Sequence, residues 1–211
     1  KQRKIYTYKS HVGWLTSFLN QLKINNSVLF GQDWGGLLGL RILVESPNIF
    51  SKVMIGNTFF PTGIGNLGSE FYKWRDYSQK SETFRIGNVV HKGTFRGLSD
   101  EEIKAYDAPF PSEDYKSGAR EFPLLVPDSE NDPAHEDQKN AWKKLIKLKK
   151  PLLTCFSDND PIMEGLEKVF INKIPGALGQ DHFITKNAGH FLQEDESVLL
   201  ANRLIKFMNL I

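Results

Sequence analysis

The chain has 211 residues, 40% of them hydrophobic, which is enough to bury the core of one large domain or of a domain with an insert. Its 27 basic and 25 acidic residues leave a net charge of +2, so it lacks the positive field that nucleic-acid binding requires. One cysteine excludes a disulfide framework and a thiolate metal cluster, and no apolar run approaches the ~18 residues of a membrane span. These features favour a globular protein that acts on a small, uncharged partner.

The first sixty residues predict a helix followed by a strand, a second helix and a second strand. Five apolar residues at helical spacing predict the first helix, over residues 12–22: Trp14, Leu15, Phe18, Leu19 and Leu22. The strands are residues 28–30 and 52–56, and the helix between them ends near Ser46 because Pro47 cannot continue it. Two strands joined through a helix are parallel, so we expect an α/β core with a mostly parallel sheet flanked by helices.

Residues 61–133 differ from the segments on either side. Prolines and glycines separate short helical pieces, and no strong strand pattern is present. Within this segment Ser99 and Glu102 form a capping box that begins a helix. We expect an insert of helices on the α/β core, so that the core consists of residues 1–60 and 134–211.

The α/β pattern resumes after the insert. We expect a helix that ends at Pro151, a buried strand over residues 151–157 that contains Cys155, a helix over 165–171, a strand over 182–185 and an amphipathic helix over 197–208. In the basic run Lys143–Lys150 apolar residues alternate with lysines. This run therefore predicts the exposed face of an amphipathic helix rather than a membrane or polyanion site.

The segment Gly31–Gly36, GQDWGG, lies between the first strand and the second helix. A central residue flanked by Gly31 and Gly35 is typical of a nucleophile elbow, a strained turn that holds the side chain clear of the sheet. Asp33 is then the candidate nucleophile. The same residues are also compatible with an ordinary glycine-rich turn in which Asp33 caps the helix.

Two later loops carry residues that complete a catalytic triad with Asp33. Asp158 and Asp160 follow the buried strand, and His190 follows the strand over residues 182–185. The order nucleophile, acid, histidine is that of α/β hydrolases, and the carboxyl ends of parallel strands meet at one edge of the sheet. We therefore expect these residues to converge. The other histidines lack such a setting, and we expect surface or packing roles for them: His11, His91, His135 and His182.

An aspartate as the nucleophile indicates the substrate class. A carboxylate is ionised at neutral pH and can displace a good leaving group from a saturated carbon, which gives an alkyl ester. Histidine then deprotonates the water that attacks this ester, while the remaining aspartate orients the ring. Indole N–H groups can bind the departing monatomic anion, and Trp34 and Trp74 are the candidates. Trp74 has a simpler interpretation as an aromatic residue packed under a helical lid.

Six segments together resemble haloalkane dehalogenases of the α/β-hydrolase superfamily: GQDWGG, FYKWRDYS, AYDAPFP, GAREFP, FSDNDPIM and AGHFLQE. The resemblance implies that Asp33 is the nucleophile, that His190 is the base, and that Trp34 and Trp74 bind the halide. It also makes residues 61–133 the helical cap. By the same matching, five residues line an apolar substrate pocket: Leu37, Phe71, Phe122, Val126 and Ile162.

The acid of the triad follows either of two core strands in this family. At the first location this chain has Asn57, in MIGNT. In the later loop, Ser157 takes the glycine position of the usual Gly-x-x-Asp pattern, which makes Asp160 the match and leaves Asp158 two residues early. We therefore expect Asp160 to be the acid.

The resemblance implies hydrolytic dehalogenation of short apolar haloalkanes to alcohol, halide and a proton. Water is the second substrate, and no metal or organic cofactor takes part. We expect a cytoplasmic monomer with no nucleic-acid or membrane partner. The early strands of the family, about 100 residues at ordinary element lengths, would precede Lys1 and are missing from this sequence.

Two alternatives remain open. An epoxide hydrolase uses the same ester chemistry but needs paired lid tyrosines, whereas Gln32 before the nucleophile and Trp74 in the lid favour the dehalogenase. A non-catalytic truncated fragment would keep the elbow without a working site. The candidate lid tyrosines are Tyr72, Tyr77, Tyr106 and Tyr115.

Overall fold

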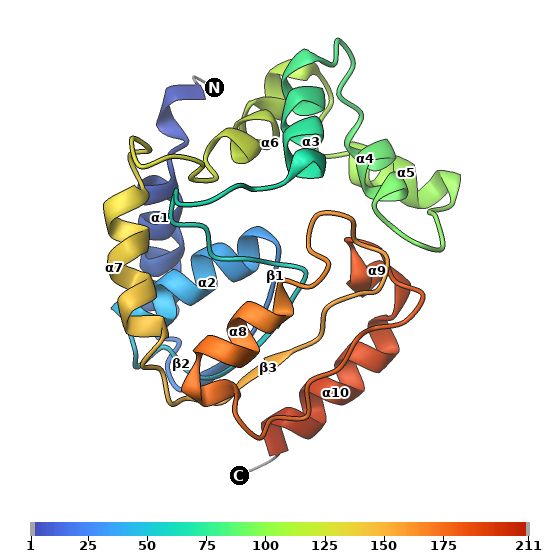
Figure 1. Cartoon of the computed structure of the whole chain (residues 1–211). Coiled ribbons are helices and arrows are strands. Elements are labelled where there is room, and N and C mark those ends of the chain that lie inside the picture. The colour runs from blue at the N-terminus through green and yellow to red at the C-terminus, as the bar shows by residue number, and fades with distance from the viewer. Residues whose placement is uncertain (1–2, 210–211) are drawn as a thin grey trace.

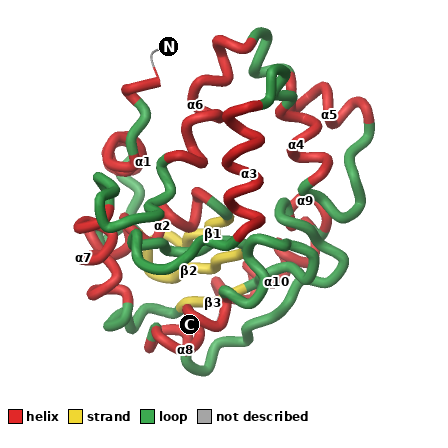
Figure 2. Tube along the Cα trace, turned by 45° about the horizontal axis from the view of Figure 1, so that its top comes forward, coloured by secondary structure: helices red, strands yellow, loops and turns green. Residues whose placement is uncertain are grey.

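The computed structural model describes residues 3–209, in which three parallel strands form the sheet (Figures 1 and 2). The strands are β1 (Ser27–Gln32), β2 (Phe50–Gly56) and β3 (Leu152–Thr154), in the order β1-β2-β3. Gln32 pairs with Gly56, and Ile55 pairs with Thr154, so the strands end at a common edge. The loops that follow the three strands therefore lie side by side, and the expected parallel sheet is confirmed.

Helices cover both faces of the sheet because side chains along each strand alternate in direction. On β2, Val53 and Ile55 belong to one core cluster and Met54 to another. Residues of α10 (Ser197–Asn209) pack in the cluster of Met54. The cluster of Val53 includes residues of five helices: α1 (Tyr8–Gln21), α2 (Trp34–Glu45), α3 (Ser69–Lys80), α7 (His135–Leu145) and α8 (Glu167–Lys173).

The segment between β2 and α7 is built from short helices, which lie together at the top of Figure 1. The predicted capping box begins one of them: the N–H of Glu102 donates to Oγ of Ser99 at 3.3 Å, and the N–H of Ser99 donates to Oε2 of Glu102 at 2.7 Å. The boundaries of this cap at residues 60 and 133 stay a prediction. Its helices are α3 (Ser69–Lys80), α4 (Ile86–Lys92), α5 (Asp100–Asp107) and α6 (Ser117–Glu121), with 3-10 turns at Glu113–Lys116 and Phe122–Leu124.

The first helix starts earlier than the sequence predicts. α1 begins at Tyr8 because the side chain of Thr7 caps its first turn, accepting a backbone N–H at 3.0 Å. Leu19 is buried, but three other residues of the predicted apolar stripe are about half exposed: Trp14, Phe18 and Leu22. The described part of the chain therefore covers only part of this stripe.

The helix before β3 is shorter than expected. α7 ends at Leu145, which is fully buried, and not at Pro151. The chain then turns to enter β3, and Nζ of Lys150 donates to the carbonyl oxygen of Phe50 at 2.5 Å. The prediction of one continuous amphipathic helix through residues 143–150 is therefore wrong.

The predicted strand over residues 182–185 is also wrong. This segment contributes a single bridge, between Thr185 and Ser157. The N–H groups of Phe183 and Thr185 donate to the carbonyl oxygens of Thr154 at 3.1 Å and Phe156 at 2.7 Å, but the N–H of Thr154 donates to Nδ1 of His182 at 3.0 Å in place of a backbone carbonyl. Because the ring of His182 takes the place of one backbone acceptor, the segment runs beside β3 with an incomplete ladder and forms no regular strand.

The composition led to two expectations, one about the burial of Cys155 and one about membrane-spanning segments. Cys155 is buried and free, as the apolar run around it predicts. Within residues 3–209, no helix combines the length and the apolar character needed to cross a membrane.

Candidate active site

Asp33 lies at the sharp turn between β1 and α2. Its backbone has φ 48° and ψ −122°, and such a conformation costs a non-glycine residue about 1–3 kcal/mol. Two bonds from the loop after β2 hold it: the hydroxyl of Thr58 donates to the carbonyl oxygen of Asp33 at 2.7 Å, and the N–H of Asp33 donates to the carbonyl oxygen of Asn57 at 3.0 Å. The strand, strained turn and helix have the form of a nucleophile elbow.

Close packing explains two glycines of the elbow. A Cβ atom on Gly36 would lie 2.2 Å from Oγ1 of Thr58, the hydroxyl that holds Asp33. A Cβ atom on Gly31 would lie 2.9 Å from the carbonyl oxygen of Gly35. The Cα of Gly35 itself faces open space, so contacts among the described residues do not require a small residue there.

The carboxylate of Asp33 is not used as a helix cap. Asp33 is the N-cap residue of α2, but its side chain makes no cap hydrogen bond, so the capping interpretation is not supported. The side chain remains 36% exposed, at a helix N-terminus whose dipole favours negative charge. Burial by the surrounding protein raises the pKa of Asp33 above its ordinary value, and the neighbouring His190 and the backbone N–H of Trp34 lower it in part.

His190 is oriented by Asp160. Its Nδ1 donates to Oδ2 of Asp160 at 2.7 Å, because an ionised carboxylate only accepts hydrogen bonds. Asp160 is 2% exposed, and its other oxygen accepts the N–H groups of Ile162 at 3.0 Å and Met163 at 3.3 Å. Both carboxylate oxygens are therefore engaged, and the imidazole is held with its proton on Nδ1 and its Nε2 toward Asp33.

The ring of His190 faces the carboxylate of Asp33 without forming a hydrogen bond to it. Nε2 of His190 lies 3.7 Å from Oδ1 of Asp33, which is too long for a hydrogen bond. Burial opposes the charged ring, but the hydrogen bond to Asp160 and the charges of Asp33 and Asp160 outweigh it and raise the pKa of His190 above its ordinary 6.5. The site thus stabilises the imidazolium that forms when a base takes up a proton.

Of the two candidate acids, Asp160 is the one that contacts His190. Oδ1 of Asp158 accepts the N–H of Ala188 at 3.3 Å, and its Oδ2 lies 3.7 Å from Nζ of Lys186. Asp158 therefore belongs to the surface of the loop, where its side chain is 25% exposed.

Asn57 joins three segments at the site, a role that the sequence did not reveal. Its Nδ2 donates to the carbonyl oxygens of Gly189 at 2.8 Å and His190 at 2.9 Å, and its Oδ1 accepts the N–H of Ser157 at 2.9 Å. The side chain is fully buried. The available signal was its position directly after a strand, at the edge where Asp33, Asp160 and His190 meet.

Trp34 and Trp74 come from the core and from the cap. Trp34 is the first residue of α2 and Trp74 lies in α3, and both are half-buried against the same apolar cluster. Among the described residues, neither indole N–H donates to a protein acceptor. The ring centroid of Trp34 lies 4.8 Å from that of Phe122, and the ring centroid of Trp74 lies 6.0 Å from that of Phe84. The two indoles stay candidates for anion binding.

The predicted pocket residues are apolar neighbours of the two indoles. Leu37, Phe71 and Val126 are buried in their cluster, Ile162 packs against it, and Phe122 contacts Trp34. A separate cavity of about 210 Å³ opens between α7, α8 and the loop after β2, and its lining contains none of the predicted site residues.

The remaining histidines have packing partners. His91 and His135 bond to backbone groups through Nδ1, and His11 stacks on Phe122 with ring centroids 4.5 Å apart. Within residues 3–209, no three His, Cys, Asp or Glu side chains are grouped so that they could hold a metal ion.

Comparisons with known proteins agree with this geometry. Residues 2–197 match the family model of the alpha/beta hydrolase fold. Over 207 residues the chain is 48% identical to a haloalkane dehalogenase of Psychrobacter cryohalolentis, which covers 98% of this chain and 68% of that protein. The chain belongs to the haloalkane dehalogenase family. Members of this family are hydrolases that act on carbon–halide bonds.

Two further members of the dehalogenase family support the assignment. A haloalkane dehalogenase of Mycolicibacterium paratuberculosis is 41% identical over 202 residues, covering 96% of this chain and 67% of that protein. The tetrameric structure of haloalkane dehalogenase DpaA from Paraglaciecola agarilytica superposes with a TM-score of 0.87 at 25% identity, over 100% of this chain and 70% of that one. The chain thus spans about two thirds of the length of its curated relatives.

The lid tyrosines of this dehalogenase do not favour the epoxide hydrolase alternative. Tyr106 donates its hydroxyl to Glu194, and Tyr72 packs against the guanidinium of Arg75. Tyr77 and Tyr115 are mainly on the surface, 41% and 64% exposed.

Proposed function

We propose that this dehalogenase hydrolyses short apolar haloalkanes with Asp33 as nucleophile, His190 as base and Asp160 as the residue that orients the base. One observation carries the assignment of roles: the two ring nitrogens of His190 face Asp160 at 2.7 Å and Asp33 at 3.7 Å. The reaction class rests on membership of the family.

In the first step Asp33 displaces the halide. A carboxylate oxygen attacks the carbon that bears the halogen, a C–O bond forms, and the C–halogen bond breaks with both electrons leaving on the halide. Trp34 and Trp74 are proposed to donate their indole N–H groups to the departing ion. The apolar side chains around the indoles, Leu37, Phe71, Phe122, Val126 and Ile162, are proposed to hold the alkyl chain.

In the second step water hydrolyses the ester. Nε2 of His190 takes a proton from water while the water oxygen attacks the carbonyl carbon of the Asp33 ester. The backbone N–H of Trp34, which bonds to the Asp33 carboxylate, is proposed to stabilise the oxyanion that forms. The bond to the alkoxide breaks, the alcohol leaves with the proton held by His190, and Asp33 loses its remaining proton to solvent. The sum is haloalkane and water to alcohol, halide and proton.

The test uses 1,2-dibromoethane and follows bromide release and protein mass. We expect continuous release by the unaltered chain and none by Asp33→Ala. His190→Phe should release one bromide per chain and then stop, and its mass should rise by one bromoethyl group on the peptide that contains Asp33.

Two outcomes would contradict the proposal. An unmodified mass in His190→Phe after exposure to substrate would exclude the ester intermediate. Absence of bromide release from the unaltered chain would favour the non-catalytic alternative.

We further infer that one chain supplies the whole triad, so that a monomer is sufficient for the chemistry. The relative DpaA is tetrameric, and light scattering after size-exclusion chromatography at several concentrations will establish the assembly of this chain. A cytoplasmic location also stays a prediction, to be checked by cell fractionation.

A further inference from the structure

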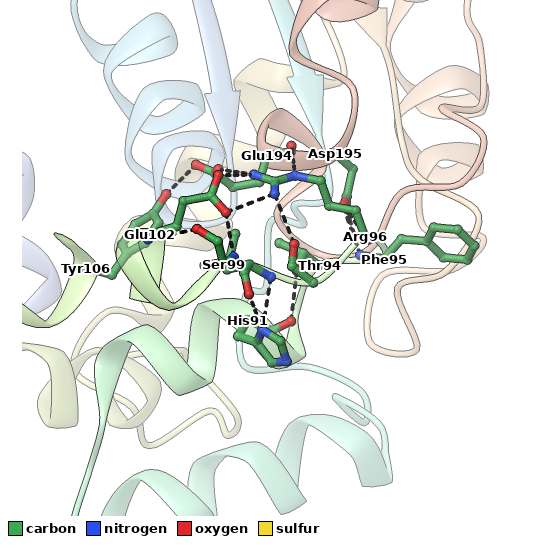
Figure 3. Close-up of polar contacts among 11 residues, drawn as sticks. His91, Thr94, Phe95, Arg96, Ser99, Glu102, Tyr106, Glu194 and Asp195 are labelled. Atoms are coloured by element: carbon green, nitrogen blue, oxygen red, sulfur yellow. Dashed lines mark hydrogen bonds and ion pairs between the residues drawn. The ribbon is translucent and has the colours of Figure 1, made fainter. Parts of the chain in front are cut away.

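Three backbone N–H groups from two distant segments converge on the carboxylate of Asp195, the last residue of α9 (Leu192–Asp195). Figure 3 shows Phe95 and Arg96 beside Asp195. Two come from the cap: Phe95 donates at 2.9 Å and Arg96 at 2.9 Å. The third comes from the core: Gly189, which precedes His190, donates to Oδ2 at 2.9 Å. Hydrogen bonds to an ionised acceptor are about twice as strong as neutral ones, so this carboxylate ties the cap to the histidine loop.

The two segments also touch backbone to backbone. The N–H of Phe191 donates to the carbonyl oxygen of Gly93 at 3.1 Å. A Cβ atom on Gly189 would lie 2.5 Å from that same carbonyl oxygen, so only glycine allows this approach. His190 therefore sits between two residues that both contact the cap.

Arg96 makes a second, more peripheral connection between the cap and α9. Its guanidinium donates to both oxygens of Glu102, at 3.0 and 2.7 Å, and its Nε donates to the carbonyl oxygen of Glu194 at 2.7 Å. Hydrogen bonds from Arg96 and from the N–H of Ser99 together lower the pKa of Glu102 to about 2. The side chains of Arg96 and Glu102 are 40% and 39% exposed, and these contacts do not include residues 189–191, so they join cap and core without holding His190.

We propose that Asp195 is a positioning residue that fixes the main chain of His190 against the cap, so that ester hydrolysis depends on the seating of the cap. The inference rests on the proposed function, because it concerns the step in which His190 acts. Alkylation by Asp33 needs no proton transfer from His190 and is therefore independent of this contact. Hydrolysis requires Nε2 to be aimed at one water molecule and is sensitive to small displacements.

The test is Asp195→Asn. An amide has one acceptor oxygen, and its NH₂ group faces N–H donors, so at least one of the three bonds is lost. We expect ester hydrolysis to slow roughly 10- to 100-fold, with the initial burst of one bromide per chain unchanged. Because hydrolysis then limits turnover, kcat and KM should fall together. Asp195→Glu keeps both acceptor oxygens and should restore part of the rate.

Arg96→Ala is the matched control, because it removes the peripheral contacts but keeps the backbone N–H that bonds Asp195. We expect its hydrolysis rate to stay near that of the unaltered chain. Equal losses in Arg96→Ala and Asp195→Asn, or an equal slowing of the burst and of hydrolysis, would overturn the proposal.

A spectroscopic readout separates this inference from the proposed function. The NMR titration of the His190 ring, assigned by its absence in His190→Phe, reports the contacts of the ring with Asp33 and Asp160 without any substrate. We expect the titration of His190 to shift in Asp195→Asn and not in Arg96→Ala. An identical titration in Asp195→Asn and the unaltered chain would overturn the positioning role even if no variant releases bromide.

Discussion

The side-chain nitrogen of Gln32 lies 3.1 Å from Nε2 of His190 and 3.0 Å from the carbonyl oxygen of the same residue. A carbonyl oxygen can only accept, so the NH₂ group and not the oxygen of the amide must face it. The second hydrogen of this NH₂ group then points to the lone pair of Nε2. Gln32 therefore favours the neutral ring and occupies the lone pair that His190 would use on water in its proposed role as base.

Replacing Gln32 by Leu should raise the pKa of His190. The neutral ring loses a hydrogen bond worth about 1 kcal/mol, so hydrolysis at a pH below that pKa should slow by a factor of about five. The measurement is the pH dependence of ester hydrolysis after rapid alkylation. Gln21→Leu, on the surface of α1, is the control. A profile that stays in place or moves to lower pH would show that Gln32 does not act on the ring.

The rates of alkylation and of ester hydrolysis should each fall at low pH, but through the titration of different groups. Alkylation needs the Asp33 anion, whose pKa is raised above its ordinary 3.8, so this step should fall as pH drops through that raised value. Hydrolysis needs the neutral His190, and in the ester Asp33 carries no charge, so this step should rise as pH increases through the pKa that the hydrogen bond to Asp160 raises. The measurement is the rate of the bromide burst, which reports alkylation, and the steady-state rate, which reports hydrolysis, each across a range of pH. Because the two groups interact in the free enzyme, the pH dependence of alkylation reports the pair and not Asp33 alone.

Asp160→Asn and Asp158→Asn distinguish the two candidate acids. Asp160→Asn removes the charge that orients the Nδ1–H tautomer, so hydrolysis should fall roughly 100-fold or more, while the burst persists. Asp158→Asn changes a residue that contacts Ala188 and Lys186, and its rate should be nearly unchanged. A large loss in Asp158→Asn with little effect in Asp160→Asn would exchange the roles.

Replacing either proposed halide ligand should weaken halide binding. Trp34→Phe and Trp74→Phe each keep an aromatic ring but lose the N–H donor, so the bromide dissociation constant should rise about tenfold or more. Bromide inhibition of the alkylation burst provides the measurement. Trp142→Phe, next to Phe60 in the separate cavity, is the matched control. Equal inhibition constants in all three variants would remove the indoles from the mechanism.

Sequence alone was sufficient for features that are encoded in short windows. The strand, glycine-flanked Asp33 and helix are adjacent along the chain, and the capping box at Ser99 spans four residues. The order of Asp33, Asp160 and His190 followed from chain order together with the rule that parallel strands end at one edge. Glycines, prolines and the spacing of apolar residues act on neighbouring residues, so such features can be predicted from the sequence.

Local patterns failed where a distant group replaced a local partner. The ladder predicted for residues 182–185 is incomplete because the ring of His182 takes the N–H of Thr154, 28 residues away, in place of a backbone carbonyl. α7 ends at Leu145, and beyond it the carbonyl oxygen of Leu148 accepts the N–H of the distant Gly176 at 2.8 Å. In both cases a tertiary contact outweighed a propensity worth only a few tenths of a kcal/mol per residue.

Only the tertiary structure decided how the base is held. Gln32 and His190 are 158 residues apart, and Asp195 lies 100 residues from Phe95. Such contacts leave no periodic pattern, because they depend on the distances between loops that the sheet brings together. Residue types and their order therefore predicted the proposed chemistry. The orientation of His190, in contrast, is set by hydrogen bonds that form only when the core and the cap are assembled.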